Sequence, residues 1–391
     1  MGPVAERLPR IASFSERRIP SAILGVEKIL EHLAAAGQCE FRVCSSMDPS
    51  PGDLAWADSL ILVRGASPQE VRLQKEAIRL GKRTACYLDD DLEEVPERAV
   101  SGLFYQMPRI RSGIGSLLRD ADLTLVTQEF LGQTLERRHR VSATILRQPR
   151  PTPPADISGE KPNSDQPVRI GFLGSLDHHA FLEELLEAPT RNLHQEFGEK
   201  IQFVFCGIAP GFAQSIAAEV IPYEMDFHAW RRRAASLGIE IGLAPLPESD
   251  FHRSKYWNKY LEYGSLAIPG IYSEGSPNAQ VVENGRTGLI APNQPAAWEE
   301  ALRTLITDAE RRREIAQASA TDVEKRFSEA ALAEQWAEAL GPILEHRAPA
   351  VDADTVQLRR GPWQHWLDRY AVYGARNTFR MMRRRIQRRR G

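Results

Sequence analysis

The chain has 391 residues, of which 42% are hydrophobic and 26% are charged. This composition is typical of a folded globular protein rather than a disordered one, and the length indicates two domains, with room for a third. No apolar run approaches the ~20 residues that a membrane-spanning helix needs, and the first residues lack the apolar core of a secretory signal. The four scattered cysteines are expected to be buried free thiols in a reducing cytoplasm.

The formal net charge of −2 hides a strong asymmetry along the chain. Residues 359–391 contain eleven arginines and one acidic residue, whereas residues 1–358 carry 39 basic and 51 acidic side chains. A basic tail on an acidic body predicts an anionic partner for the tail and not for the body.

Short apolar runs alternate with longer amphipathic stretches through most of the chain. In the first half we expect strands at 10–14, 41–44, 59–63, 84–88 and 123–126, with helices at 22–36 and 68–80. In the second half we expect strands at 168–175, 201–207, 239–246 and 267–273, with helices at 296–306 and 329–344. This βαβ alternation predicts an α/β fold of two Rossmann-like, doubly wound domains, each with a parallel sheet.

The two alternating regions are separated by residues 149–167, which contain six prolines and almost nothing apolar. Such a composition is typical of a linker. We therefore expect an N-terminal domain at 1–150, a linker at 151–167, a second domain at 168–346, and a linker with the basic tail at 347–391.

Ligands of doubly wound sheets bind at the carboxyl ends of the strands, so the residues that follow the predicted strands are the candidate site. Gly174 and Ser175 follow the first strand of the second half, where small residues let backbone N–H groups approach a phosphate at a helix start. Gly207 follows the next strand.

Two lysines and a glutamate follow the third strand of the second half. Lys255 and Lys259 come first, and Glu262 lies one helical turn after Lys259, on the same helix face. A lysine can neutralise a diphosphate while a carboxylate accepts hydrogen bonds from ribose hydroxyls. By spacing alone, a solvated Lys–Glu pair on a helix surface is the more frequent arrangement.

The run FHRSKYWNKYLEYGSLAIPGIYS at 251–273, followed by VENGRTGLI at 282–290, resembles the donor-site signature of GT-B glycosyltransferases, particularly the family-4 type. The resemblance covers roughly residues 168–340. It implies a GT-B fold with an acceptor domain first and a donor domain second. It also implies transfer, with retention, of a hexose-like sugar from a nucleoside diphosphate donor to a glycan or lipid-linked acceptor in cell-surface polysaccharide biosynthesis.

Position by position, the resemblance implies that Lys259 contacts the diphosphate, that Glu262 contacts the ribose, and that Gly174 and Ser175 form the phosphate loop. Leaving-group stabilisation is then the main catalytic effect. No metal and no other cofactor are expected, because a lysine and a helix N-terminus can supply the charge that Mg²⁺ supplies elsewhere.

The chain departs from the family pattern at two positions. Ser254 stands eight residues before Glu262, where the family often has a glutamate that contacts the donor sugar. A Ser-Lys pair, here Ser254 and Lys255, recurs at this position in some relatives. Ala267 replaces the glycine that usually precedes the Ile-Pro of the signature.

In the first half, Asp89, Asp90 and Asp91 follow a predicted strand. As cleft residues they would bind acceptor hydroxyls, with Asp90 as the catalytic carboxylate. The alternative is structural, because acidic residues after a strand often cap the next helix. Ser21 precedes the first helix and is expected to cap it, although the resemblance implies that the corresponding loop approaches the donor.

Two other functions remain open: a GT-B nucleotide-sugar epimerase, and a non-catalytic GT-B-like scaffold of a polysaccharide assembly complex. The tail 359–391 repeats aromatic and apolar residues at intervals of three or four between its arginines, a pattern typical of an interfacial membrane helix. We expect a cytoplasmic protein whose tail contacts an anionic membrane surface. Docking of the tail on the protein's own domains is the alternative, and nucleic acid is not the expected partner.

Overall fold

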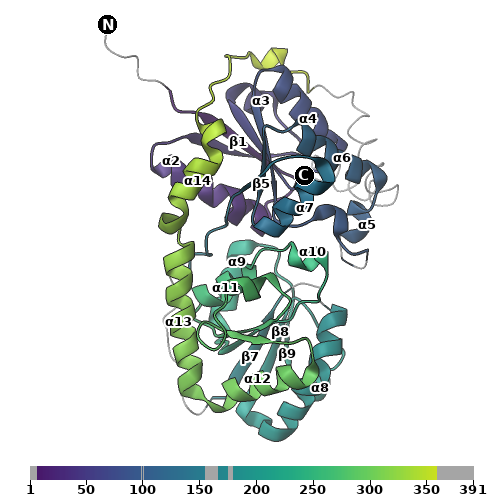
Figure 1. The fold of residues 1–391 in the computed structure, drawn as a ribbon, viewed down its shortest axis with the longest axis vertical. Helices are drawn as coiled ribbons and strands as arrows, with labels where there is room; N and C mark the ends of the chain where they lie inside the picture. The colour runs from purple at the N-terminus through teal and green to yellow at the C-terminus, as the bar shows by residue number, and fades with distance from the viewer. Residues whose placement is uncertain (1–6, 98, 100, 155–165, 175–178, 359–391) are drawn as a thin grey trace, which may run out of the picture. The chain divides into compact units, whose positions relative to one another are not determined.

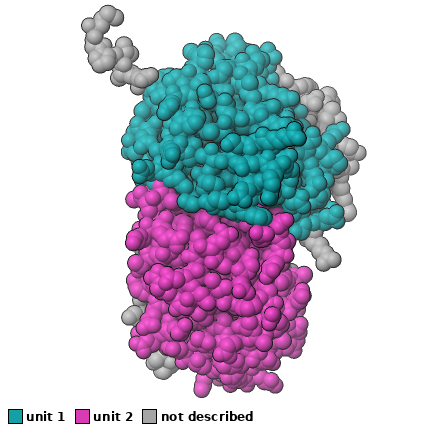
Figure 2. All heavy atoms as spheres, in the orientation of Figure 1, with its two compact units in different colours: residues 1–147, 333–391 teal, residues 148–332 magenta. Residues whose placement is uncertain are grey.

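The computed structural model describes residues 7–97, 99, 101–154, 166–174 and 179–358. Ser175, the middle of the linker and the basic tail therefore lie outside the described residues. The chain divides into two compact units, residues 1–147 with 333–391 and residues 148–332 (Figure 2). Each unit has its own parallel sheet and hydrophobic core, so the predicted α/β class is confirmed. Within the described ranges, no helix is long and apolar enough to cross a bilayer.

Unit 1 is built on a six-stranded sheet in the order β2-β1-β3-β4-β5-β6, with every neighbouring pair parallel. Its strands are β1 (Arg10–Ser15), β2 (Glu40–Ser45), β3 (Ser59–Val63), β4 (Arg83–Leu88), β5 (Leu123–Val126) and β6 (Ala143–Ile145). Its main helices are α2 (Lys28–Ala35), α3 (Pro51–Trp56), α4 (Pro68–Arg79), α6 (Pro108–Asp120) and α7 (Glu129–His139) (Figure 1). All five residues of β3 are buried, as expected for a central strand of a parallel sheet.

The first helix differs from the continuous helix expected at 22–36. It consists of α1 (Pro20–Ala22), a π-helical turn η1 (Ile23–Glu27) and then α2. Gly25 lies in the π turn directly against Tyr87 of β4, so closely that a Cβ there would meet the tyrosine hydroxyl at 2.0 Å. The N-cap residue is Ile19 and not Ser21, so the expected capping role of Ser21 is wrong.

The C-terminal part of α14 (Glu329–Leu344), and the segment after it, belong to unit 1. Trp336 is fully buried and donates its indole N–H to the carbonyl of Arg147 at 2.8 Å. Asp58 accepts a hydrogen bond from the backbone N–H of Ala348 at 2.9 Å, and η7 (Ala353–Thr355) packs against α3 (Figure 1). The second unit therefore does not extend to the expected residue 346, because these contacts join the chain from Ala333 onward to the first sheet.

Unit 2 has a second parallel sheet in the order β12-β11-β10-β7-β8-β9. Its strands are β7 (Val168–Leu173), β8 (Ile201–Cys206), β9 (Glu219–Ile221), β10 (Ile241–Ala244), β11 (Gly270–Ser273) and β12 (Leu289–Ala291). Its helices are α8 (His179–Phe197), α9 (Phe227–Ser236), α10 (Asp250–Arg253), α11 (Asn258–Ser265), α12 (Pro295–Thr307) and α13 (Ala309–Phe327). Counted from β7, this is the 3-2-1-4-5-6 strand order of dinucleotide-binding Rossmann domains.

Helix α11 is held on this sheet by a buried tyrosine. The hydroxyl of Tyr263 donates to the carbonyl of Leu243 in β10 at 2.6 Å, and the ring lies against Gly242, where a Cβ would come within 2.7 Å of it. On the same helix, Tyr260 donates to the carboxylate of Asp322 in α13 at 2.6 Å. These two hydrogen bonds fix how closely α11 packs on the sheet and which of its faces points toward the sheet.

The same helix ends in a Schellman motif. The N–H of Ile268 donates to the carbonyl of Tyr263 at 2.9 Å, and the N–H of Ala267 donates to the carbonyl of Gly264 at 3.1 Å. Ala267 has a φ of +53°. This position of the motif is usually glycine, because a Cβ is strained in the left-handed conformation. The alanine noted as a departure from the family pattern therefore occupies a strained backbone position.

Two glycines lie in contact at the carboxyl ends of β7 and β8. Gly207 has a φ of +76°, and a Cβ on it would lie 2.3 Å from the carbonyl oxygen of Gly174. A Cβ on Gly174 would in turn meet the ring of Phe172 at 2.2 Å. Both glycines are thus required by the packing of the sheet edge, whatever they contact in a ligand.

We expect Ala267→Gly to raise the free energy of unfolding by about 0.5–1 kcal/mol, because glycine removes the left-handed strain at a small entropic cost. Urea denaturation measures the change. As a matched control, Ala318→Gly in the middle of α13 should lower stability by about 0.5–1 kcal/mol. Destabilisation of the same size by both variants would show that Ala267 is not strained.

We expect Gly207→Ala to destabilise unit 2 by about 2 kcal/mol or more, because the left-handed φ and a backbone clash act together. Gly198→Ala is the control, since Gly198 also has a positive φ of +55° but has nothing within 4 Å of the added Cβ. That variant should cost only about 1 kcal/mol. Equal losses in thermal or urea unfolding would contradict the close contact with Gly174.

Candidate active site

The strand order of unit 2 places a switch point between β7 and β10, which are neighbours in the sheet although the strands β8 and β9 lie between them in the chain. In doubly wound sheets the ligand crevice lies outside the carboxyl ends of the strands at such a point. The ammonium group of Lys259 reaches this position, because its Nζ donates to the carbonyl of Leu173, the last residue of β7. The structure thus places Lys259 at the carboxyl end of β7, and its contact with a diphosphate stays a prediction.

Lys259 also forms an ion pair within its own helix. Its Nζ lies 2.7 Å from Oε2 of Glu262, and the two side chains are 27% and 13% exposed. The pair is thus largely removed from water, unlike the solvated surface pair that spacing alone favoured. Interactions between charges strengthen as water is excluded, so the electrostatics of this pair matter more than those of an exposed one.

Glu262 is surrounded by donors and cations from two helices. Its Oε1 accepts a hydrogen bond from the indole N–H of Trp230 in α9 at 3.3 Å, and Arg231 lies beside it in the same helix. Burial by itself would raise the pKa of Glu262, but Lys259, Arg231 and the indole donor together lower that pKa below its ordinary value. The carboxylate is therefore ionised at neutral pH and can accept hydrogen bonds from hydroxyl groups.

The predicted donor residues Gly174, Gly207, Lys259 and Glu262 are thus brought to one edge of one sheet. Gly174 directly follows Leu173, to which Lys259 is bonded, and Gly207 touches Gly174. The N–H groups of the two glycines donate to the carbonyls of Cys206 and Ile221, so the cation Lys259 is the group of this set that can meet an anionic ligand where the sheet order predicts one.

Ser254 and Lys255 differ from this group in their surroundings. Ser254 is fully buried, and its hydroxyl donates to the carbonyl of Phe251 at 2.7 Å at the end of α10. Its predicted contact with the donor sugar stays a prediction, and the contact that the structure shows is local. The ammonium group of Lys255 lies 4.5 Å from the centre of the Phe251 ring, a cation–π contact.

Asp90 and Asp89 follow β4 in unit 1 and share one arginine. The guanidinium of Arg64 lies 2.8 Å from Asp89 and 3.0 Å from Asp90, and its Nη1 also points at the hydroxyl of Ser21. Burial by itself would lower the pKa of the guanidinium, but the neighbouring acidic groups raise that pKa overall. Arg64 has a φ of +51°, a strained conformation of the kind that clusters at functional sites. The catalytic role of Asp90 stays a prediction.

Asp91 does not cap the helical turn that follows it. No side-chain capping bond is present at η2 (Leu92–Glu94), so the capping alternative is wrong for this residue. Instead Asp91 accepts two hydrogen bonds from Arg138 of α7, at 2.7 and 2.9 Å, and the same guanidinium contacts Glu93 at 3.0 Å. This buried ionic cluster anchors the loop that carries Asp89 and Asp90.

Sequence reasoning missed Trp230, Arg231 and Arg64. Trp230 and Arg231 lie in α9, which follows the short edge strand β9 that was not predicted. The run WRRR within α9 looks like a solvated helix face, and only the tertiary fold shows that its first two residues turn toward α11. Arg64 follows a strand, so the rule that directed attention to Asp89 and Asp90 also applied to it.

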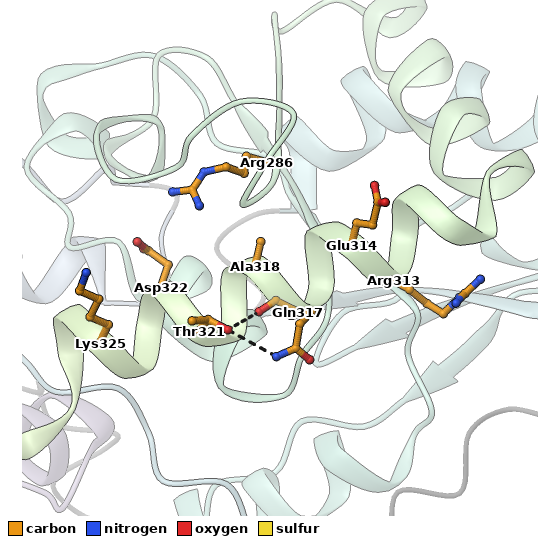
Figure 3. A pocket seen from close by; sticks show the side chains of 8 residues that line it. All are labelled: Arg286, Arg313, Glu314, Gln317, Ala318, Thr321, Asp322 and Lys325. Atoms are coloured by element: carbon orange, nitrogen blue, oxygen red, sulfur yellow. Dashed lines mark hydrogen bonds between the residues drawn. The ribbon is translucent and has the colours of Figure 1, made fainter.

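A surface pocket of about 650 Å³ lies along α13 (Figure 3). Its lining side chains are of both signs, and one of them, Arg286, reaches over the helix from the turn before β12. None of the predicted site residues is among its described lining residues.

Within the described part of the chain, no group of three His, Cys, Asp or Glu side chains is placed to hold a metal ion. All four cysteines are buried free thiols, as expected.

No family model matches the chain, and no curated protein does. Solved structures are similar in fold at low sequence identity. Sucrose-phosphate synthase from Thermosynechococcus elongatus has a TM-score of 0.61 at 16% identity, over 86% of this chain and 99% of that one. HepE from Anabaena, in complex with UDP-glucose, has a TM-score of 0.57 at 12% identity, over 85% of this chain and 99% of that one.

A candidate UDP-N-acetylglucosamine 2-epimerase from Listeria monocytogenes is also similar, with a TM-score of 0.53 at 11% identity over 88% of this chain and all of that one. At these identities the likeness concerns the fold alone. The strand order of both sheets and the near-complete coverage agree with the resemblance found in the sequence. This chain therefore has the two-domain GT-B fold.

Proposed function

We propose that the chain is a glycosyltransferase that moves a sugar from a nucleoside diphosphate donor to a hydroxyl group of a glycan or lipid-linked acceptor, with retention at the anomeric carbon. The observation that carries the proposal is the Lys259–Glu262 pair at the switch point of a Rossmann-ordered sheet. The fold neighbours support it, because HepE was solved with UDP-glucose and another neighbour is sucrose-phosphate synthase. Cell-surface polysaccharide biosynthesis is the proposed setting.

In this proposal the ammonium group of Lys259 neutralises the diphosphate. Negative charge grows on the diphosphate as its bond to the anomeric carbon breaks, and a cation beside the diphosphate stabilises that charge. The positive end of α8, which begins after Gly174, adds to the effect. The residues therefore provide the charge stabilisation for which a metal would otherwise be needed, and we propose that none is required.

Glu262 would accept hydrogen bonds from the ribose hydroxyls of the donor. Its lowered pKa supports this role, because an ionised carboxylate offers only acceptor positions to a diol. On the acceptor side, Asp90 is the proposed carboxylate, paired with Arg64 in the absence of an acceptor. Ser254 remains the proposed sugar contact from the family pattern, in need of a local rearrangement that exposes its hydroxyl.

A second candidate function is nucleotide-sugar epimerisation, which the fold likeness to the Listeria protein favours. The two functions differ in their need for an acceptor. Mass spectrometry of nucleotide-sugar turnover separates them, because an epimerase converts its donor without any acceptor. A protein that binds no nucleotide would instead favour the scaffold function.

We expect Lys259→Ala to weaken the binding of nucleoside diphosphates by about 1.5–3 kcal/mol, the size of a lost hydrogen bond to a charged group. Glu262→Gln should weaken UDP or GDP binding while leaving the affinity for free pyrophosphate unchanged. Calorimetry measures both. Lys200→Ala is the control, since Lys200 is exposed at the amino end of β8, the opposite edge of the same sheet. Wild-type affinity in both site variants would contradict the donor site.

We also propose that the basic tail 359–391 holds the enzyme at the cytoplasmic face of an anionic membrane. Each arginine near such a surface contributes about 1 kcal/mol. Truncation after Gly374 removes most of these arginines and should abolish co-sedimentation with anionic vesicles at low salt. High salt should release the full-length chain, because the attraction is screened. Equal vesicle binding by both forms would exclude the arginine-rich end as the anchor.

A further inference from the structure

Arg231 is a buried cation whose hydrogen-bonding capacity is largely unused. The residue is 4% exposed, and its Nη2 donates to the hydroxyl of Ser265 at 3.0 Å. Its Nε and Nη1 have no hydrogen-bond partner among the residues that the structure describes. Arginine is rarely buried without a carboxylate in direct contact, because loss of hydration is costly. The burial of the Arg231 guanidinium without a carboxylate in direct contact therefore needs an explanation.

The guanidinium lies next to the helix that carries the donor residues. Ser265, its hydrogen-bond partner, lies one turn after Glu262 and donates its own hydroxyl to the Glu262 carbonyl at 2.8 Å. The preceding residue of α9, Trp230, donates to the Glu262 carboxylate. Two consecutive residues of α9 thus donate to a single turn of α11, Trp230 to the carboxylate of Glu262 and Arg231 to the hydroxyl of Ser265.

Of the two cations near Glu262, one can move and the other is held in place by burial. Lys259 contacts the carboxylate directly on a flexible stem, whereas Arg231 acts through space from a buried position. Among the described residues, Tyr263, Tyr272 and Cys206 also interact with Glu262, and burial raises the pKa of each, so that they are neutral at physiological pH. Arg150, which also interacts with Arg231, is paired with Glu324.

Donor binding would change this balance. If Lys259 turns its ammonium group to the diphosphate, as in the proposed function, Glu262 loses its direct partner while it is still largely buried. A buried carboxylate without a counter-charge tends to take up a proton, and a protonated carboxyl accepts ribose hydrogen bonds poorly. A second cation that does not move with the ligand would prevent this.

We propose that Arg231 is a positioning residue that keeps Glu262 ionised and directed at the ribose while Lys259 engages the diphosphate. The inference rests on the proposed donor site. Because Arg231 is buried, it acts through Glu262 and Ser265 and does not touch the donor. Its effect should therefore appear in the nucleoside part of the binding energy and depend on pH.

The test compares full-length wild type with Arg231→Met, Arg231→Lys and Arg232→Met, by calorimetry with UDP and with inorganic pyrophosphate. Arg232 is the matched control, since it is the next arginine of α9 but is exposed. In Arg231→Met we expect UDP affinity to fall about tenfold or more at about pH 5.5 and clearly less at about pH 8, while pyrophosphate affinity is unchanged. The sign follows because removal of a cation makes the carboxylate easier to protonate. Arg231→Lys should restore most of the affinity, and Arg232→Met should match wild type.

Thermal unfolding of each variant separates this role from a merely structural one. If Arg231→Met does not fold, Arg231→Lys carries the test: its UDP affinity should fall by a smaller factor, and by more at about pH 5.5 than at about pH 8, while its pyrophosphate affinity is unchanged. A loss that is equal for UDP and pyrophosphate, or that is flat with pH, would overturn the inference. The inference would also be overturned if Glu262→Gln weakened UDP binding relative to wild type but Arg231→Met did not. That result would leave the proposed donor site intact. Wild type that binds no nucleoside diphosphate would instead refute the proposed function.

Discussion

The bond between the Tyr263 hydroxyl and the carbonyl of Leu243 decides where helix α11 lies on the second sheet. The hydroxyl of a buried tyrosine needs a hydrogen-bond partner, and here that partner is the carbonyl of a strand residue. The neighbouring residue, Gly242, has no side chain and so leaves room for the tyrosine ring. With the helix fixed at this depth, Lys259 on its first turn reaches the last carbonyl of β7. The position of the candidate donor site therefore depends on an interaction that contains no donor residue.

Both sheets have charged side chains at their carboxyl ends. In the groups described below, cations outnumber carboxylates in unit 2, and carboxylates outnumber cations in unit 1. In unit 2, the carboxylate of Glu262 is accompanied by two cations, Lys259 and the buried Arg231. In unit 1, the guanidinium of Arg64 is shared by two aspartates, Asp89 and Asp90. Parallel strands make this possible, because their carboxyl ends and the loops that follow them all lie at one edge.

Close packing at the same edges limits what can vary. Gly174 and Gly207 touch each other, and Gly25 touches Tyr87, so these glycines are constrained by their neighbours before any ligand is considered. Ala267 shows the opposite case, a side chain in a backbone conformation that glycine fits better. The identity of a loop residue in this fold can therefore be set by packing, by function or by both. Only the contacts of that residue in the structure distinguish these causes.

The sequence by itself determined the α/β class and the two sheets, and it predicted candidate donor residues that the structure places at one edge of the second sheet. It could do so because central strands form continuous apolar runs, and because Lys259, Glu262 and Gly174 are close to such runs in the chain. It did not reveal β6, β9 and β12, which are three-residue strands at the sheet edges with little apolar surface to bury. Only the tertiary structure decided that the chain after Ala333 joins the first unit, and that Trp230 and Arg231 turn toward Glu262. These contacts join segments far apart in sequence, and no local periodicity encodes a partner that folding brings from another helix.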